Sequence, residues 1–88
     1  MKFKDQWVWI TGASSGIGKA LAIEFSKEGA HLILSSRKEN DLLDVGKLCT
    51  GPGRTEIVTL DLADEESLDK AYSEVEDYTS SIDVLVNN

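Results

Sequence analysis

The sequence predicts an α/β fold in which a parallel β-sheet carries helices on both faces. Its 88 residues alternate between short β-favouring apolar runs and longer segments with helical spacing, in the order β-α-β-α-β-α-β. Such alternation is typical of parallel strands joined by right-handed helical crossovers. A glycine-rich turn follows the first apolar run, and no internal repeat or linker interrupts the pattern. We therefore expect residues 1–88 to belong to a single domain.

Composition excludes several classes of function. Hydrophobic residues make up 41% of the chain, and the formal net charge of −7 disfavours nucleic acid or an anionic membrane as partners. The single cysteine, Cys49, forms no internal disulfide, which fits a reducing compartment, and we expect it to be an apolar filler. No apolar run reaches the ~18 residues of a membrane span, and the first residues lack the apolar segment of a signal peptide. We expect a cytoplasmic protein.

Residues 7–11 predict the first strand. The run Trp-Val-Trp-Ile-Thr is almost continuously apolar, as expected for a strand covered on both faces. Alternation along a strand places Trp7 and Trp9 on one face and Val8 on the other. We expect both tryptophans to pack in the core.

The first helix should begin at residue 15 or 16 and end at residue 28, with Gly29 as its stop signal. Three large apolar residues, Ile17, Leu21 and Phe25, recur every four positions. This stripe is expected to pack against the sheet.

The remaining elements follow from the same signals. They are a strand at 31–36, a helix at 39–49, a loop at 50–53, a strand at 56–60, a third helix and a strand at 84–86. The lone His31, at the start of its strand, is expected to be an ordinary, partly exposed histidine because no second histidine pairs with it.

The third helix should begin after Asp64, which is a good N-cap residue followed by two glutamates. Its buried stripe should consist of Leu68, Ala71, Tyr72 and Val75. The many acidic residues of this region could bind a divalent metal, but at helical spacing they are more typical of a solvated face. We predict no metal site.

The glycine-rich turn at 11–18 predicts a site for a diphosphate. Gly16 and Gly18, with the backbone N–H groups of the first helical turn, are expected to hold the anion, and Ser14 and Ser15 add hydroxyl donors. Such a turn can also be a mere tight connection, but its place between a buried strand and an amphipathic helix favours a nucleotide site.

Distinctive residues follow every predicted strand. Besides the glycine turn, these are Arg37, Asp61, Asn87 and Asn88. In an open parallel sheet, ligands bind beyond the carboxyl ends of the strands. We therefore expect these residues to lie at one edge of the sheet.

Arg37 indicates the cofactor. A dinucleotide fold that selects NAD places an acid near the end of its second strand, whereas an arginine accommodates the 2′-phosphate of NADP. Here the strand ends Ser-Ser-Arg-Lys with no acid, which favours NADP(H). The alternative is that Arg37 and Lys38 are exposed residues that open the second helix. Asp61 is placed to bind the adenine amine or, alternatively, only starts the turn before the third helix.

Three motifs in register resemble the N-terminal part of a short-chain dehydrogenase/reductase. Residues 11–18 match that family's TGxxxGxG turn, Asp61 and Leu62 match its adenine-side motif, and residues 83–88 match the start of its NNAG strand. The resemblance covers residues 5–88. It implies a Rossmann-type doubly wound parallel sheet with strand order 3-2-1-4, of which this chain is the N-terminal part.

The resemblance also implies residue roles. Cofactor-binding residues carried over from the family are Gly12, Ser14, Ser15, Gly16, Ile17 and Gly18 around the diphosphate and adenosine, Ser36 and Arg37 at the 2′-phosphate, and Asp61, Leu62 and Asn88 at adenine and its ribose. It further implies hydride transfer between NADP and a small-molecule carbonyl or alcohol, and a homo-oligomeric parent enzyme.

The catalytic residues of that family are not found here. Its members use a serine and a tyrosine with a lysine four positions further on, but Tyr72 is followed at that distance by Glu76 and Tyr78 by Ile82. We expect both tyrosines to be packing residues and the chain alone to be inactive. Two hypotheses stay open: the cofactor-binding half of an oxidoreductase, or a stand-alone nucleotide-binding module. An unpaired final strand edge favours the first.

Overall fold

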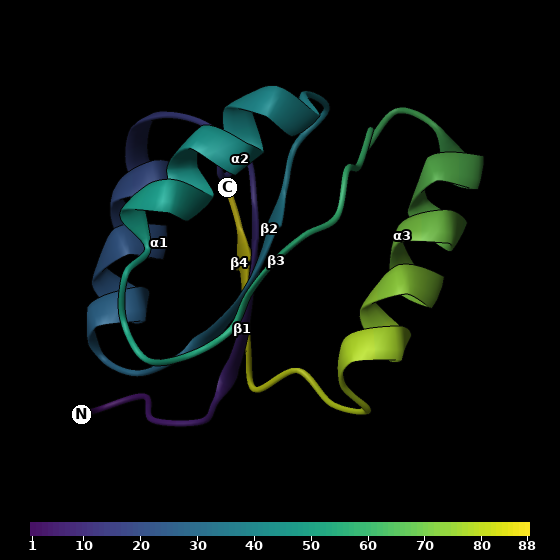
Figure 1. Cartoon of the computed structure of the whole chain (residues 1–88). Coiled ribbons are helices and arrows are strands. Elements are labelled where there is room, and N and C mark those ends of the chain that lie inside the picture. The colour runs from purple at the N-terminus through teal and green to yellow at the C-terminus, as the bar shows by residue number, and fades with distance from the viewer.

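The computed structural model describes residues 1–88 as one parallel sheet with three helices (Figure 1). Its strands are β1 (Trp7–Thr11), β2 (His31–Ser35), β3 (Thr55–Ile57) and β4 (Val84–Asn87), and its helices are α1 (Gly16–Lys27), α2 (Glu39–Leu48) and α3 (Glu65–Tyr78). The strands lie in the order β3-β2-β1-β4, and every neighbouring pair is parallel. The predicted fold class and strand order are confirmed.

The register of the sheet brings the ends of the central strands level. Thr11, the last residue of β1, lies opposite Ser35 of β2 on one side and Asn87 of β4 on the other. The turns that leave these strands therefore begin at the same edge, where the functional residues were expected.

Two hydrophobic clusters cover the two faces of the sheet. Figure 1 shows α1 and α2 on one side of the strands and α3 on the other. Val8 is fully buried in the cluster that faces α1 and α2, whereas Trp9 belongs to the cluster beneath α3. The partly buried Trp7 packs on the same side as Trp9. The alternation predicted for the first strand is thus confirmed.

Helix α1 presents a different face to the sheet from the one predicted. Its buried residues are Gly18, Ala22 and Ser26, while Ile17 is 70% exposed. Leu21 and Phe25 are only partly buried at the edge of the cluster. The reason is that small residues let the helix backbone approach the sheet closely, so the buried stripe is one position away from the large apolar residues.

The expected burial of Tyr72 was also wrong. Ala71 and Val75 face the sheet, and the neighbouring Tyr72 is rotated outward and 53% exposed. Its ring still stands edge-on to Trp9, with centroids 5.3 Å apart. Tyr78 packs, partly buried, against the same cluster. Both tyrosines therefore make packing contacts.

The third strand is shorter than predicted. It covers 55–57, although Val58 and Leu60 still donate N–H hydrogen bonds to the carbonyls of Leu34 and Ser36. These residues stay alongside β2 until that strand ends at Ser35 and the chain turns toward α2. Because β3 is an edge strand, no second neighbour completes a ladder on its outer side.

The helix ends follow the sequence signals. Gly29 has φ of +85° and donates to the carbonyl of Ser26, while Ala30 donates to Phe25, which is the Schellman arrangement. Asp64 caps α3 by accepting the N–H of Glu66 at 3.0 Å, as predicted. None of the three helices combines the length and apolar character required to cross a membrane.

Candidate functional site

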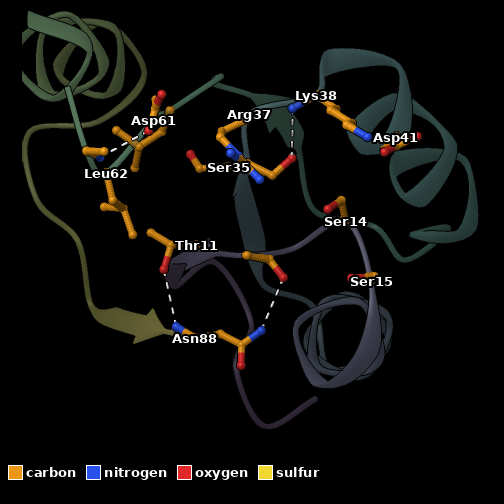
Figure 2. A pocket seen from close by; sticks show the side chains of 14 residues that line it. Thr11, Ser14, Ser15, Ser35, Arg37, Lys38, Asp41, Asp61, Leu62 and Asn88 are labelled. Carbon is orange, nitrogen blue, oxygen red and sulfur yellow. Dashed lines mark hydrogen bonds between the residues drawn. The ribbon is translucent and has the colours of Figure 1, made fainter.

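A cavity of about 570 Å³ lies at the carboxyl-end edge of the sheet (Figure 2). It is bounded by residues that follow each of the four strands. Its lining consists of Thr11, Gly12, Ser14, Ser15, Ser35, Ser36, Arg37, Lys38, Asp41, Leu60, Asp61, Leu62, Ala63 and Asn88. The structure therefore brings together the strand ends that the sequence singled out.

The start of α1, beside this cavity, has backbone N–H groups without hydrogen-bond partners. Gly12 and Gly16 adopt φ angles of +62° and +57°, which allow the chain to turn sharply from β1 into the helix. No hydrogen bond within the protein uses the N–H groups of residues 14–18. Ser15 stands at the N-cap in an extended conformation, but its side chain makes no cap hydrogen bond. The first turn contains no acidic residue, so its positive end faces solvent unneutralised.

Gly18 fixes the position of α1 against the glycine turn. A Cβ atom at this residue would lie 2.2 Å from the Gly12 carbonyl oxygen and 2.9 Å from Asn88 Nδ2. Nothing larger than glycine fits without a shift of the helix. By contrast, a Cβ at Gly16 would meet no atom within 4 Å, so that glycine is required by its backbone angle and leaves open space before the helix.

The end of β4 is bonded to the glycine turn. The Thr11 hydroxyl lies 3.1 Å from Asn87 Oδ1 and 3.3 Å from the Val86 carbonyl, and it accepts the N–H of Asn88 at 3.2 Å. Asn88 Nδ2 donates to the Gly12 carbonyl at 3.2 Å (Figure 2). These bonds join the carboxyl end of β4 to the glycine turn beside the cavity.

The wall of the cavity formed by the residues that follow β2 is positively charged. Arg37 and Lys38 follow β2, are exposed, and have no carboxylate within 4.0 Å. The Ser36 hydroxyl accepts the N–H of Lys38 at 3.3 Å, which orders this turn. The wall also contains Asp41, from the first turn of α2, an acid close to the basic residues that the sequence analysis missed.

Asp61 and Leu62 form the third side. Asp61 Oδ1 accepts the N–H of Ala63 at 3.0 Å, and the Asp61 N–H donates to Ser67 Oγ at 2.9 Å. Asp61 therefore does start the turn before α3, while it also lines the cavity. Leu62, although apolar, is 58% exposed at the cavity edge. It offers a flat ligand an apolar contact.

Eight of the eleven residues predicted from the sequence line the cavity: Gly12, Ser14, Ser15, Ser36, Arg37, Asp61, Leu62 and Asn88. Three residues at the start of α1 do not line it: Gly16, Ile17 and Gly18. The lining residues that the sequence analysis did not assign are Thr11, Ser35, Lys38, Asp41, Leu60 and Ala63. Lys38 could have been assigned because it directly follows Arg37, whereas no sequence signal distinguished Asp41 from the other acidic residues of the chain.

Two other residues considered in the sequence lie away from the cavity. Cys49 is buried at the end of α2, and burial raises the pKa of its thiol above the ordinary value. His31 is partly buried, accepts the Arg54 N–H at Nδ1 over 2.9 Å, and has Nε2 3.5 Å from Asp5 Oδ1. Cys49 is the expected packing residue. No group of three or more His, Cys, Asp or Glu side chains is arranged to hold a metal ion.

Known proteins resemble this chain in sequence. Over 89 aligned residues, the chain is 42% identical to the Mus musculus protein "Dehydrogenase/reductase SDR family member 7", covering 96% of this chain and 26% of that protein. It is 38% identical to a protein of Listeria innocua named "NAD-dependent glycerol dehydrogenase", covering 96% of this chain and 32% of that protein. The chain thus spans about a quarter to a third of the length of these relatives.

A solved structure matches the whole chain. L-sorbose reductase from Gluconobacter frateurii, in complex with NADPH and L-sorbose, superposes with a TM-score of 0.91 at 36% identity, covering 100% of this chain and 34% of that one. The family model described as short chain dehydrogenase matches residues 6–88. Together with the parallel sheet and the glycine turn, this match shows that the chain belongs to the short-chain dehydrogenase family of oxidoreductases.

Proposed function

We propose that this chain is the NADP(H)-binding half of an oxidoreductase that transfers hydride between NADP and a carbonyl or alcohol substrate. The observation that carries the proposal is the shared cavity between the uncapped start of α1 and the unpaired Arg37. A diphosphate and a 2′-phosphate are both anions, and the two positive regions suit these two separate phosphate groups of one NADP molecule.

The start of α1 suits the diphosphate. Backbone N–H groups without protein acceptors, together with the helix dipole, form a favourable anion site. The hydroxyls of Ser14 and Ser15 are further donors beside them. Gly16 leaves open space there, and Gly18 keeps the helix close to the turn, so we assign both of them, with Ile17 and Gly12, to the backbone frame around the diphosphate.

Arg37 suits the 2′-phosphate of NADP. Its guanidinium has five donors and no competing carboxylate in the structure, and Ser36 adds a hydroxyl nearby. We place adenine and its ribose linkage along Asp61, Leu62 and Asn88. Asp61 keeps the capacity to accept from an amine because only one of its carboxylate oxygens is used in the turn.

The contacts described so far concern cofactor binding, and the transfer of hydride requires further groups. Bound NADP(H) would supply the hydride, and the residues described here would bind and orient it. Tyr72 packs against Trp9 and Tyr78 against the core, which supports our proposal that the reacting side chains come from the remainder of an enzyme about three to four times as long. We expect that enzyme to be cytoplasmic, as the single cysteine suggests, and homo-oligomeric, as the resemblance to the family implies.

Cofactor binding tests the proposal. Dissociation constants for NADP and NAD are measured by calorimetry on the intact protein in which this sequence occurs, and on Arg37→Glu. Because hydrogen bonds to charged groups contribute about 1.5–3 kcal/mol, we expect the variant to lose about 10- to 100-fold of its NADP affinity relative to NAD. Lys70→Glu, an exposed lysine of α3, is the charge-matched control and should change neither constant.

Two results would contradict the proposal: no binding of either dinucleotide, or an unchanged preference in Arg37→Glu. The stand-alone module is tested separately. If the intact mass is 9.6 kDa and the protein binds NADPH without oxidising it in the presence of a panel of carbonyl compounds, the second hypothesis holds instead. A mass about three to four times larger, together with turnover, supports the enzyme.

A further inference from the structure

We propose that Asp41 weakens the preference of the cavity for NADP over NAD, and so determines how strict the cofactor choice is. This inference rests on the proposed function, because it concerns the same dinucleotide. Asp41 belongs to the first turn of α2 and lines the same cavity as Arg37 and Lys38. In Figure 2, Lys38 and Asp41 occupy the α2 edge, and Arg37 lies between them and Asp61.

The Asp41 carboxylate has no ion-pair or hydrogen-bond partner within the protein. No cation lies within 4.0 Å of its carboxylate, and its side chain makes no hydrogen bond in the protein. The exposed carboxylate is therefore free to act on a ligand beside Arg37. Asp44, one turn further along the same helix, is also exposed but does not line the cavity.

The two cofactors would meet this carboxylate differently. The 2′-phosphate of NADP is an anion, so Asp41 repels it and offsets part of the attraction by Arg37 and Lys38. The 2′-hydroxyl of NAD is a donor, which a carboxylate at this end of a dinucleotide site accepts favourably. Asp41 thus acts against NADP and in favour of NAD. Because the group is exposed, the effect is small and sensitive to salt.

The test compares Asp41→Asn with Asp44→Asn in the intact protein. Both substitutions remove one negative charge from α2, but only the first alters the cavity. We expect Asp41→Asn to raise the ratio of NADP affinity to NAD affinity about two- to fivefold, as measured by calorimetry at low ionic strength. The gain should shrink when salt is added. Asp44→Asn should leave the ratio unchanged.

Other outcomes overturn the inference and separate it from the proposed function. An unchanged or lower ratio in Asp41→Asn refutes it, as does an equal rise in Asp44→Asn. If the ratio fails to respond to Asp41→Asn while Arg37→Glu still abolishes the NADP preference, only the role of Asp41 is wrong. If the wild-type protein binds neither dinucleotide, both proposals fail.

Discussion

Replacing Gly18 with alanine tests whether close contact between α1 and the glycine turn holds the site together. The new Cβ would lie 2.2 Å from the Gly12 carbonyl oxygen, more than an ångström inside ordinary van der Waals contact. The atom it meets is backbone and cannot rotate away. It would also approach Asn88 Nδ2 to 2.9 Å and disturb the hydrogen bond from that amide to Gly12.

The expected magnitude follows from three contributions. Overpacking costs about 1–3 kcal/mol, and the disturbed hydrogen bond costs about 1 kcal/mol more. Alanine recovers up to about 1 kcal/mol of helix propensity. We expect Gly18→Ala to lower the free energy of unfolding by about 1–3 kcal/mol. It should also weaken NADP binding, because α1 must shift relative to Gly12, which lines the cavity.

Gly46→Ala is the matched control. This glycine lies in α2, and a Cβ there would meet Ile57 and Thr55 at an ordinary 3.8 Å. Here the propensity gain stands without a clash, so the free energy of unfolding should rise by about 0.5–1 kcal/mol. Urea unfolding of the intact protein, followed by the fluorescence of Trp7 and Trp9, measures both variants. Equal stability of the two alanine variants would refute the close-contact argument.

Two further predictions concern a helix cap and the buried cysteine. Asp64→Ala removes the acceptor of the Glu66 N–H and should lower the free energy of unfolding by about 0.5–2 kcal/mol; Ser15→Ala, which removes no cap bond, should change it by less than about 0.5 kcal/mol. If urea unfolding shows equal losses, α1 is capped in solution. Burial raises the pKa of Cys49, so its contribution to stability is complete below the ordinary cysteine value of about 8.5 and is lost as the pH rises toward the folded value. Urea unfolding between pH 7 and 10 should therefore show a steeper alkaline loss for the wild type than for Cys49→Ala, and parallel curves would contradict this.

The fold was predictable because its main signals are local. Alternation assigned Val8 and Trp9 to opposite faces, and Gly29 and Asp64 marked helix ends by the conformations and hydrogen bonds that they favour. The buried face of α1 was not predictable from hydrophobicity. It depends on the contact of Gly18 with Gly12, and a glycine gives no apolar signal, so the exposed Ile17 was wrongly placed on the sheet side.

The site was predictable where it depends on strand ends. Arg37, Asp61 and Asn88 each follow a strand, and parallel strands bring such residues to one edge. Asp41 was missed because it is on a helix, and only the angle at which α2 leaves the sheet decides whether its first turn faces the cavity. Its residue type did not single it out either, because the chain has 16 acidic residues.

A comparison of two helix starts connects the structure to the proposed function. At α3 the protein supplies its own anions: Asp64 accepts a backbone N–H, and Glu65 and Glu66 occupy the first turn. At α1 the N-cap side chain makes no bond, the first turn has no acid, and residues 14–18 have N–H groups without protein acceptors. A missing side-chain cap leaves a helix less stable by about 1 kcal/mol. An anion bound at α1 would supply that interaction, so stability that the chain forgoes at this helix becomes available as binding energy for a diphosphate.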